Sequence, residues 1–154
     1  MNAKKAEQAM NVINRQSYFF EDLEVGMEAS FAKTVSEADI VLFAGVSGDT
    51  NPVHLDQSFA EKTPFKTRIA HGMLSAGFIS TVFGTKLPGP GAIYMSQTLR
   101  FKAPVKIGDT VVATCTVTEL IPEKRRANFS TVCKVGDTVV IEGEATIMVP
   151  SRNK

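Results

Sequence analysis

The fold is decided by residues 71–84, which read HGMLSAGFISTVFG. The apolar side chains in this stretch leave no polar face and no charged residue interrupts them; they are Met73, Leu74, Ala76, Phe78, Ile79, Val82 and Phe83. A helix that is apolar nearly all round is buried on all sides. At about 1.5 Å per residue this helix is roughly 20 Å long, which suits the centre of one domain. A membrane span needs about twenty apolar residues, so the stretch is too short to be one.

After this helix the sequence changes to a period of two, which is typical of strands with one buried face. The alternation predicts strands at 92–102, 109–120, 127–134 and 138–148, with a further short strand near 28–35. In the first of these, the expected apolar face consists of Ile93, Met95, Leu99 and Phe101. One apolar face per strand favours an antiparallel sheet laid over something buried, and the helix at 71–84 is the candidate. The sequence therefore predicts an α+β fold, in which a curved antiparallel sheet wraps round a central apolar helix.

The size and charge of the chain narrow the class of protein. Its 154 residues favour one domain, which we place at 18–150 after a polar extension at 1–17. With 17 basic and 16 acidic residues the net charge is +1, which argues against nucleic acid as the main partner. The N-terminus lacks the apolar stretch of a secretory signal. Cys115 and Cys133 lie within predicted strands, and we expect both to be small core residues. We therefore expect a cytoplasmic enzyme or binding protein with no membrane partner.

The segment from Gly48 to Arg68 is rich in turn residues and lies outside this pattern. A helix is expected before it, beginning after Ser36 and ending at Gly45 or Gly48. Inside the segment we expect one short helix near 56–61, with Asp56 as its cap. Loops of this length without a long element are often functional.

Asp49 and His54 are the first candidates for chemistry in this segment. The intervening Asn51-Pro52 favours a turn that can fold the two side chains back towards one point. Histidine titrates near neutrality, and a dry pocket can raise the pKa of a carboxylate into the same range, so the two could form an acid–base pair. In the alternative interpretation Asp49 caps a turn and His54 fills a surface position.

The start of the helix at 71–84 is the second candidate. Backbone amides at a helix start are unpaired and lie at its positive end, and Gly72 lets a ligand carbonyl approach closely. This is the physical basis of an oxyanion hole. Alternatively, Gly72 only eases entry into the helix and His71 is a local cap. Ser80 either bonds the preceding helical turn or faces a substrate.

Other catalytic motifs are excluded. Gly72-Met73-Leu74-Ser75-Ala76-Gly77 is one residue too long for a nucleophile elbow, and no zinc-binding pattern occurs. The sequence thus predicts neither a metal site nor a cofactor.

Four stretches of the sequence resemble the MaoC-like (R)-specific enoyl-CoA hydratase family, the hydratase 2 branch of the hot-dog proteins. They are SGDTNPVHLD at 47–56, IAHGML at 69–74, FEDLEVG at 20–26 and FKAPVKIGD at 101–109. The resemblance covers about residues 18–149 and implies the hot-dog fold, which agrees with the sheet and helix expected above. It also implies that Asp49 and His54 are the catalytic pair, that the Gly72 amide binds the thioester oxygen, and that Ser80 and Asn51 lie at the substrate.

From the resemblance and the candidate residues together we expect reversible syn hydration of a trans-2-enoyl-CoA to the (3R)-3-hydroxyacyl-CoA. Asp49 and His54 are expected to hold one water, and the acyl tail to lie between helix and sheet beside Phe78 or Met73. We also expect a homodimer, since proteins with this fold generally pair their sheets edge to edge. The alternatives are an acyl-CoA thioesterase and a non-catalytic acyl-CoA-binding module.

Overall fold

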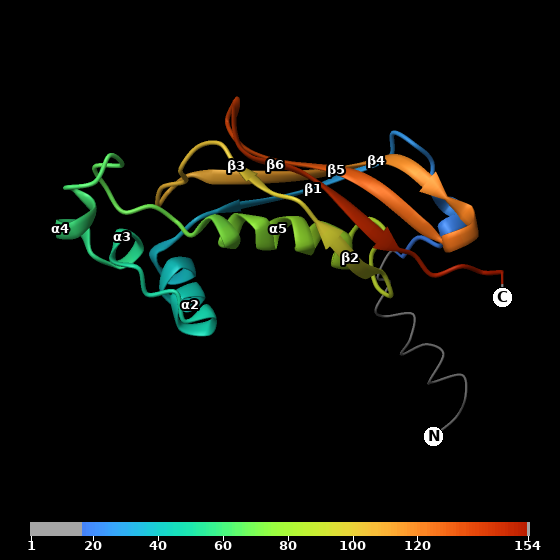
Figure 1. The fold of residues 1–154 in the computed structure, drawn as a ribbon, viewed down its shortest axis with the longest axis horizontal. Helices are drawn as coiled ribbons and strands as arrows, with labels where there is room; N and C mark the ends of the chain where they lie inside the picture. The colour runs from blue at the N-terminus through green and yellow to red at the C-terminus, as the bar shows by residue number, and fades with distance from the viewer. Residues whose placement is uncertain (1–16, 154) are drawn as a thin grey trace, which may run out of the picture.

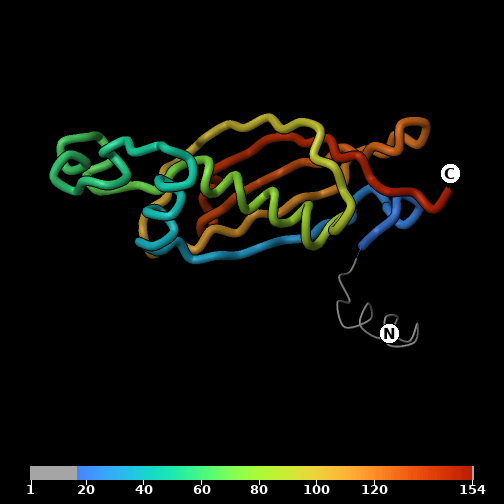
Figure 2. Tube along the Cα trace, turned by 90° about the horizontal axis from the view of Figure 1, so that it is seen from below, coloured from blue at the N-terminus to red at the C-terminus, as the bar shows by residue number. Residues whose placement is uncertain are grey.

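The computed structural model describes residues 17–153 and forms one antiparallel sheet with one long helix on its concave face (Figures 1 and 2). The strands are β1 (Glu28–Thr34), β2 (Ile93–Gln97), β3 (Arg100–Phe101), β4 (Thr110–Ile121), β5 (Arg126–Val135) and β6 (Thr138–Met148). The helices are α2 (Glu37–Ser47), α3 (Pro52–Leu55), α4 (Gln57–Ala60) and α5 (Gly72–Thr85), with short 3-10 turns η1 (Phe20–Asp22) and η2 (Pro122–Lys124). All but residue 17 of the predicted polar extension, 1–17, lies outside the described residues.

The sheet has six strands in the order β1-β4-β5-β6-β2, and β3 pairs with β6 beside β2. Every pairing between these strands is antiparallel. In Figure 2 the helix α5 runs across the strands on the inner side of the curved sheet. This is the architecture that the alternating pattern predicted, and it is the hot-dog fold.

The buried faces of the central strands follow the predicted period of two. The side chains that β4 and β5 turn towards α5 are buried; they are Val111, Ala113, Cys115 and Val117 on β4, and Ala127, Phe129, Thr131 and Cys133 on β5. Burial raises the pKa of both cysteine thiols to about 12, so they remain neutral. The cysteines are therefore core residues, as predicted.

Helix α5 is not buried on all sides, which corrects the expectation from its composition. Phe78, Ile79, Val82 and Phe83 pack against the sheet, but the opposite side of the helix is exposed. The exposed residues repeat at helical spacing; they are Met73, Gly77, Ser80 and Gly84. The reason is geometric, because the sheet covers one side of the helix and no other described element covers the second.

The strand expected at 92–102 is interrupted between β2 and β3. The carbonyl oxygen of Thr98 passes so close to Gly143 of β6 that a Cβ added there would lie 1.8 Å from it. The backbone of Thr98 bonds Glu144 on the same strand, at 2.8 Å. The expected buried face is also wrong, since three of its four members are exposed, namely Ile93, Met95 and Phe101. β2 lies at the edge of the sheet, and its side chains on both faces are largely exposed in the described chain.

The turn-rich segment folds as short helices that project from one end of the sheet (Figures 1 and 2). As predicted, the Ser36 side chain caps α2 by accepting from the Asp39 amide, and α2 ends at Gly48 in a left-handed conformation. The Asp56 side chain caps α4, also as predicted. Helix α3 was not expected. We call residues 48–71, from the end of α2 to the start of α5, the connecting segment.

Within the described residues no helix is both long enough and apolar enough to cross a membrane.

Candidate active site

Asp49 and His54 meet because two turns within the connecting segment reverse the chain. One carboxylate oxygen of Asp49 accepts from the Asn51 amide at 3.2 Å, and the Asn51 side chain accepts from the Val53 amide at 3.1 Å, which begins α3. This places the other carboxylate oxygen, Oδ2, at 4.0 Å from Nε2 of His54. The predicted pair is therefore brought together, with the acid on the exposed side and the imidazole on the buried side.

The other nitrogen of His54 defines the state of the ring. Nδ1 lies 2.8 Å from the carbonyl oxygen of Ile69, which can only accept, so Nδ1 carries a proton and donates it. The pKa of His54 is lowered, chiefly by burial and further by the neighbouring His71, while the Ile69 contact and Asp49 oppose the shift. The neutral ring therefore keeps the lone pair on Nε2, facing the Asp49 carboxylate.

His71, the residue immediately before α5, packs against His54. The two ring centroids are 3.8 Å apart with 31° between the ring planes. Nε2 of His71 lies 2.9 Å from the backbone carbonyl oxygen of Asp49 and donates to it. Its Nδ1 is buried and has no hydrogen-bond partner among the described residues. His71 thus contacts both members of the pair.

Arg68 fixes the backbone on the other side of α3. Its Nε donates to the carbonyl oxygen of His54 at 2.6 Å, and its two terminal nitrogens each bond a carboxylate oxygen of Glu37 at 2.9 Å. A two-pronged contact of this kind orients the guanidinium as well as holding it. Arg68 therefore ties α3 to the start of α2, a role that the sequence did not reveal.

Gly72 is the first residue of α5, so its amide has no acceptor inside the helix. The ring of Phe101, from β3, lies so close to Gly72 that an added Cβ would come within 2.5 Å of it. A glycine is therefore required if Phe101 is to keep this position. The amide lies at the positive end of the α5 dipole, where a developing negative charge is stabilised.

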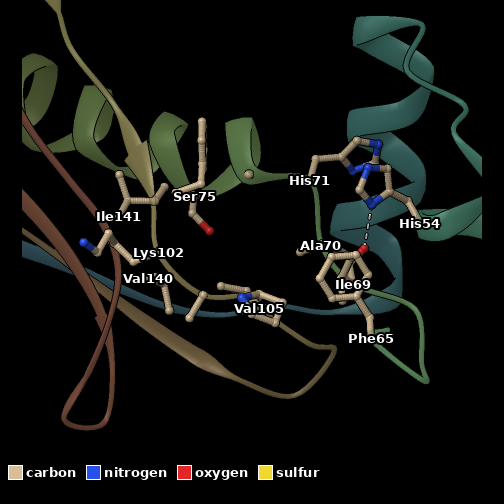
Figure 3. Close-up of a pocket in the computed structure, with 14 residues that line it drawn as sticks. His54, Phe65, Ile69, Ala70, His71, Ser75, Lys102, Val105, Val140 and Ile141 are labelled. Carbon is tan, nitrogen blue, oxygen red and sulfur yellow. Dashed lines mark hydrogen bonds between the residues drawn. The ribbon is translucent and has the colours of Figure 1, made fainter. Parts of the chain in front are cut away.

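A cavity of about 300 Å³ opens beside these groups, between the start of α5 and the sheet (Figure 3). His54, His71 and Gly72 line one end, and the remainder is mostly apolar, with Phe101, Val105, Val140 and Ile141 among its walls. Figure 3 shows the Ser75 hydroxyl pointing into this space, and that oxygen has no partner among the described residues.

Neither Phe78 nor Met73, beside which the acyl tail was expected, lines this cavity. Phe78 is in the core against the sheet, and Met73 is on the exposed side of α5. Ser75 was overlooked, although its spacing of three residues from Gly72 puts both on one side of a helix.

Two other predicted site residues lie elsewhere. Ser80 is exposed and outside the cavity, since five residues along a helix turn the side chain by about 140° from Ser75. Asn51 is occupied as the cap of α3. For both residues contact with substrate stays a prediction.

Among the described residues, one group has the donor atoms that a metal ion needs, namely Asp49, His54 and His71. One ligand atom from each lies within 4.8 Å of the others. A metal binds imidazole along the nitrogen lone pair, in the plane of the ring. Nδ1 of His54 and Nε2 of His71 are each hydrogen-bonded to a backbone carbonyl oxygen, so Nε2 of His54 and Nδ1 of His71 are the ring nitrogens left for a ligand.

The curved sheet, the helix on its concave face and the site at the helix start define a protein of the hot-dog class. Comparison with protein families identifies it more closely: residues 21–143 match the MaoC-like domain, and the chain belongs to that family.

Characterised relatives agree with this assignment. The chain is 66% identical over 116 residues to an (R)-specific enoyl-CoA hydratase of Rhodospirillum rubrum, covering 75% of this chain and 81% of the relative. It is 57% identical over 115 residues to a 3-hydroxybutyryl-CoA dehydratase of Methylorubrum extorquens, covering 75% and 73%. The unliganded R-hydratase of Pseudomonas aeruginosa has a similar structure, with a TM-score of 0.84, 47% identity and 88% of each chain covered.

Proposed function

We propose that this protein catalyses the reversible syn addition of water to a trans-2-enoyl-CoA, giving the (3R)-3-hydroxyacyl-CoA. The observation that carries the proposal is the 4.0 Å spacing between Nε2 of His54 and Oδ2 of Asp49, beside the amide end of α5. The names of the relatives support the same reaction class. The enzyme is then a lyase whose own side chains supply the acid–base chemistry.

The spacing between Asp49 and His54 suits one shared water. It is too long for a direct hydrogen bond between the two side chains. A water oxygen placed about 2.8 Å from each of these two atoms makes an Nε2–water–Oδ2 angle of about 90°. Such an angle allows the water to hydrogen-bond both side chains at once. Because Nδ1 of His54 is committed to Ile69, only Nε2 exchanges protons with this water.

The Gly72 amide supplies the electrophilic half of the reaction. When it binds the thioester oxygen, electron density moves from C3 towards that oxygen and C3 accepts the water oxygen. The resulting enolate is stabilised at the same amide, an effect worth on the order of 3 kcal/mol for one such donor. C2 then takes a proton from the pair on the face that received the hydroxyl. The product therefore has all the atoms of the enoyl-CoA and of one water, and no other group is released.

We assign the acyl chain to the cavity beside Gly72. Its walls are mostly apolar and it adjoins His54 and the start of α5, so a thioester at Gly72 can direct its tail there. Ser75 provides a single polar group within it.

The test is the purified protein with crotonyl-CoA, followed at the enoyl absorbance together with a thiol reagent. Loss of the absorbance without free thiol, and a product of (3R) configuration on chiral analysis, is the expected result. Release of free CoA would instead make the protein a thioesterase. Saturable binding with neither change would make it a binding module.

We further propose a homodimer in the cytoplasm, formed through the β2 edge and the exposed side of α5. Ile93 and Met95 on β2 are exposed, and an unprotected edge strand favours pairing with another chain. A second copy at this place would also cover Ser80, which lies on the exposed side of α5. Sedimentation of the active protein tests this, and a strictly monomeric species would contradict it.

A further inference from the structure

We propose that His71 is a positioning residue for the hydration reaction: it holds the backbone of Asp49 where the carboxylate faces His54. This inference rests on the proposed function for its kinetic test. Its geometric basis, the contact between His71 and the Asp49 carbonyl, is independent of the reaction.

Asp49 needs such support because the rest of its surroundings are local or exposed. Its side chain is about half exposed, at 51% of the accessible area. Its side chain accepts from the Asn51 amide two residues away, and its own amide donates to the Ser47 hydroxyl two residues before it. The bond from Nε2 of His71, at 2.9 Å, comes from 22 residues away and ties Asp49 to the start of α5.

The same ring fixes the second member of the pair. His71 stacks on His54 at 3.8 Å and also contacts the Phe43 ring of α2, with the centroids 4.8 Å apart. Only 2% of His71 is exposed, so the ring has little room to rotate. One side chain therefore sets the position of Asp49 by a hydrogen bond and that of His54 by packing.

Packing alone does not account for a histidine here. Nδ1 of His71 is buried without a partner among residues 17–153. A buried nitrogen without a partner is destabilising relative to an apolar ring of similar size. Phenylalanine would keep the contacts with Phe43 and His54 and avoid that cost. What it cannot provide is the N–H that bonds the Asp49 carbonyl.

The matched variants are His71→Phe, which keeps a ring but has no donor, and His71→Gln, which keeps a nitrogen donor at a similar reach. We expect His71→Phe to lower kcat roughly 10- to 100-fold, the scale of a small misplacement of reacting groups, with little change in KM. His71→Gln should recover part of that loss, since it restores the donor to the Asp49 carbonyl but not the ring that packs on His54. An unchanged kcat in His71→Phe, equal losses in both variants, or a change in KM alone would overturn the proposal.

Crystal structures of the same two variants give a readout that needs no turnover. The distance from Oδ2 of Asp49 to Nε2 of His54 should remain near the 4.0 Å of the parent in His71→Gln and lengthen in His71→Phe. An unchanged distance in His71→Phe would overturn the positioning role even if activity fell. If the parent protein itself fails to hydrate crotonyl-CoA, the proposed function fails, while the two structures still decide whether His71 places Asp49.

Discussion

The sheet and the connecting segment hold their shapes by different means. The central strands β4, β5 and β6 bury rows of apolar side chains against α5, so burial of apolar surface fixes them. The connecting segment has few buried apolar residues and depends on side-chain contacts to backbone groups, such as Arg68 to His54 and His71 to Asp49. The sheet therefore provides stability, and the segment provides the exact placement of polar groups.

This difference leads to a general expectation for substitutions. A change in the core of the sheet should lower the free energy of unfolding and leave the rate of the remaining folded enzyme nearly unchanged. A change to a polar side chain that positions Asp49 or His54 in the connecting segment should lower the rate and leave stability nearly unchanged. The four predictions below test that division, beginning with the largest effect.

Asp49→Asn and His54→Gln should each lower kcat by about 10²–10⁴-fold, because each removes one half of the acid–base pair. Asp56→Asn is the matched control in the same segment, since asparagine is an equally good helix cap. It should retain activity within a few fold. Initial rates with crotonyl-CoA and thermal unfolding of all three variants measure this. Near-normal hydration by either pair variant would refute the assignment.

Phe129→Ala should destabilise the protein by about 3–5 kcal/mol, because this side chain is fully buried between the sheet and α5. Phe59→Ala, at a ring that is 45% exposed, is the control and should cost much less. Denaturant unfolding gives both values. If the Phe129→Ala protein is as stable as its parent but has lost its activity, the sheet core does not have the stabilising role assigned to it here.

Gly72→Ala should lower kcat/KM by about tenfold, since a misplaced group near the chemistry costs rate more than stability. The added methyl group would meet the Phe101 ring at 2.5 Å, so the ring or the start of α5 would have to shift. Gly45→Ala in α2 is the control, because a Cβ there meets nothing within 4 Å of the described chain. Equal activities of these two variants would remove Gly72 from the site.

The smallest effect is on the pH dependence of stability. The folded protein lowers the pKa of His54 below its ordinary 6.5, so the unfolded chain takes up this proton first. Stability therefore falls as the pH drops from 6.5 through the lowered pKa. His54→Gln should show a shallower fall between pH 7 and pH 5. Because the chain has 2 histidines, an imidazole NMR titration can follow His54 directly, and a pKa above 6.5 would contradict this.

The repeating parts of the fold were predictable from the sequence. Alternation along β4 and the apolar run of α5 each repeat a local pattern, and the caps Ser36 and Asp56 identify helix starts through their own side chains. The close spacing of Asp49 and His54 also followed from local turn chemistry.

What could not be predicted depends on contacts between distant parts of the chain. The break between β2 and β3 arises where Thr98 crosses Gly143, and neither residue signals the other in the sequence. The apolar composition of α5 suggested cover on all sides, whereas the sheet covers one side, and Ser75 lies on that side beside the cavity. Nothing in the sequence indicates that Arg68 bonds both α2 and α3.

The most direct test of the account is hydration of crotonyl-CoA in D₂O by the parent protein, with the relative configuration at C2 and C3 determined by NMR coupling constants. If one water held between Asp49 and His54 supplies both groups, the deuterium at C2 and the hydroxyl at C3 lie on the same face in essentially all of the product. A product with the two on opposite faces, or an equal mixture, would contradict the shared water.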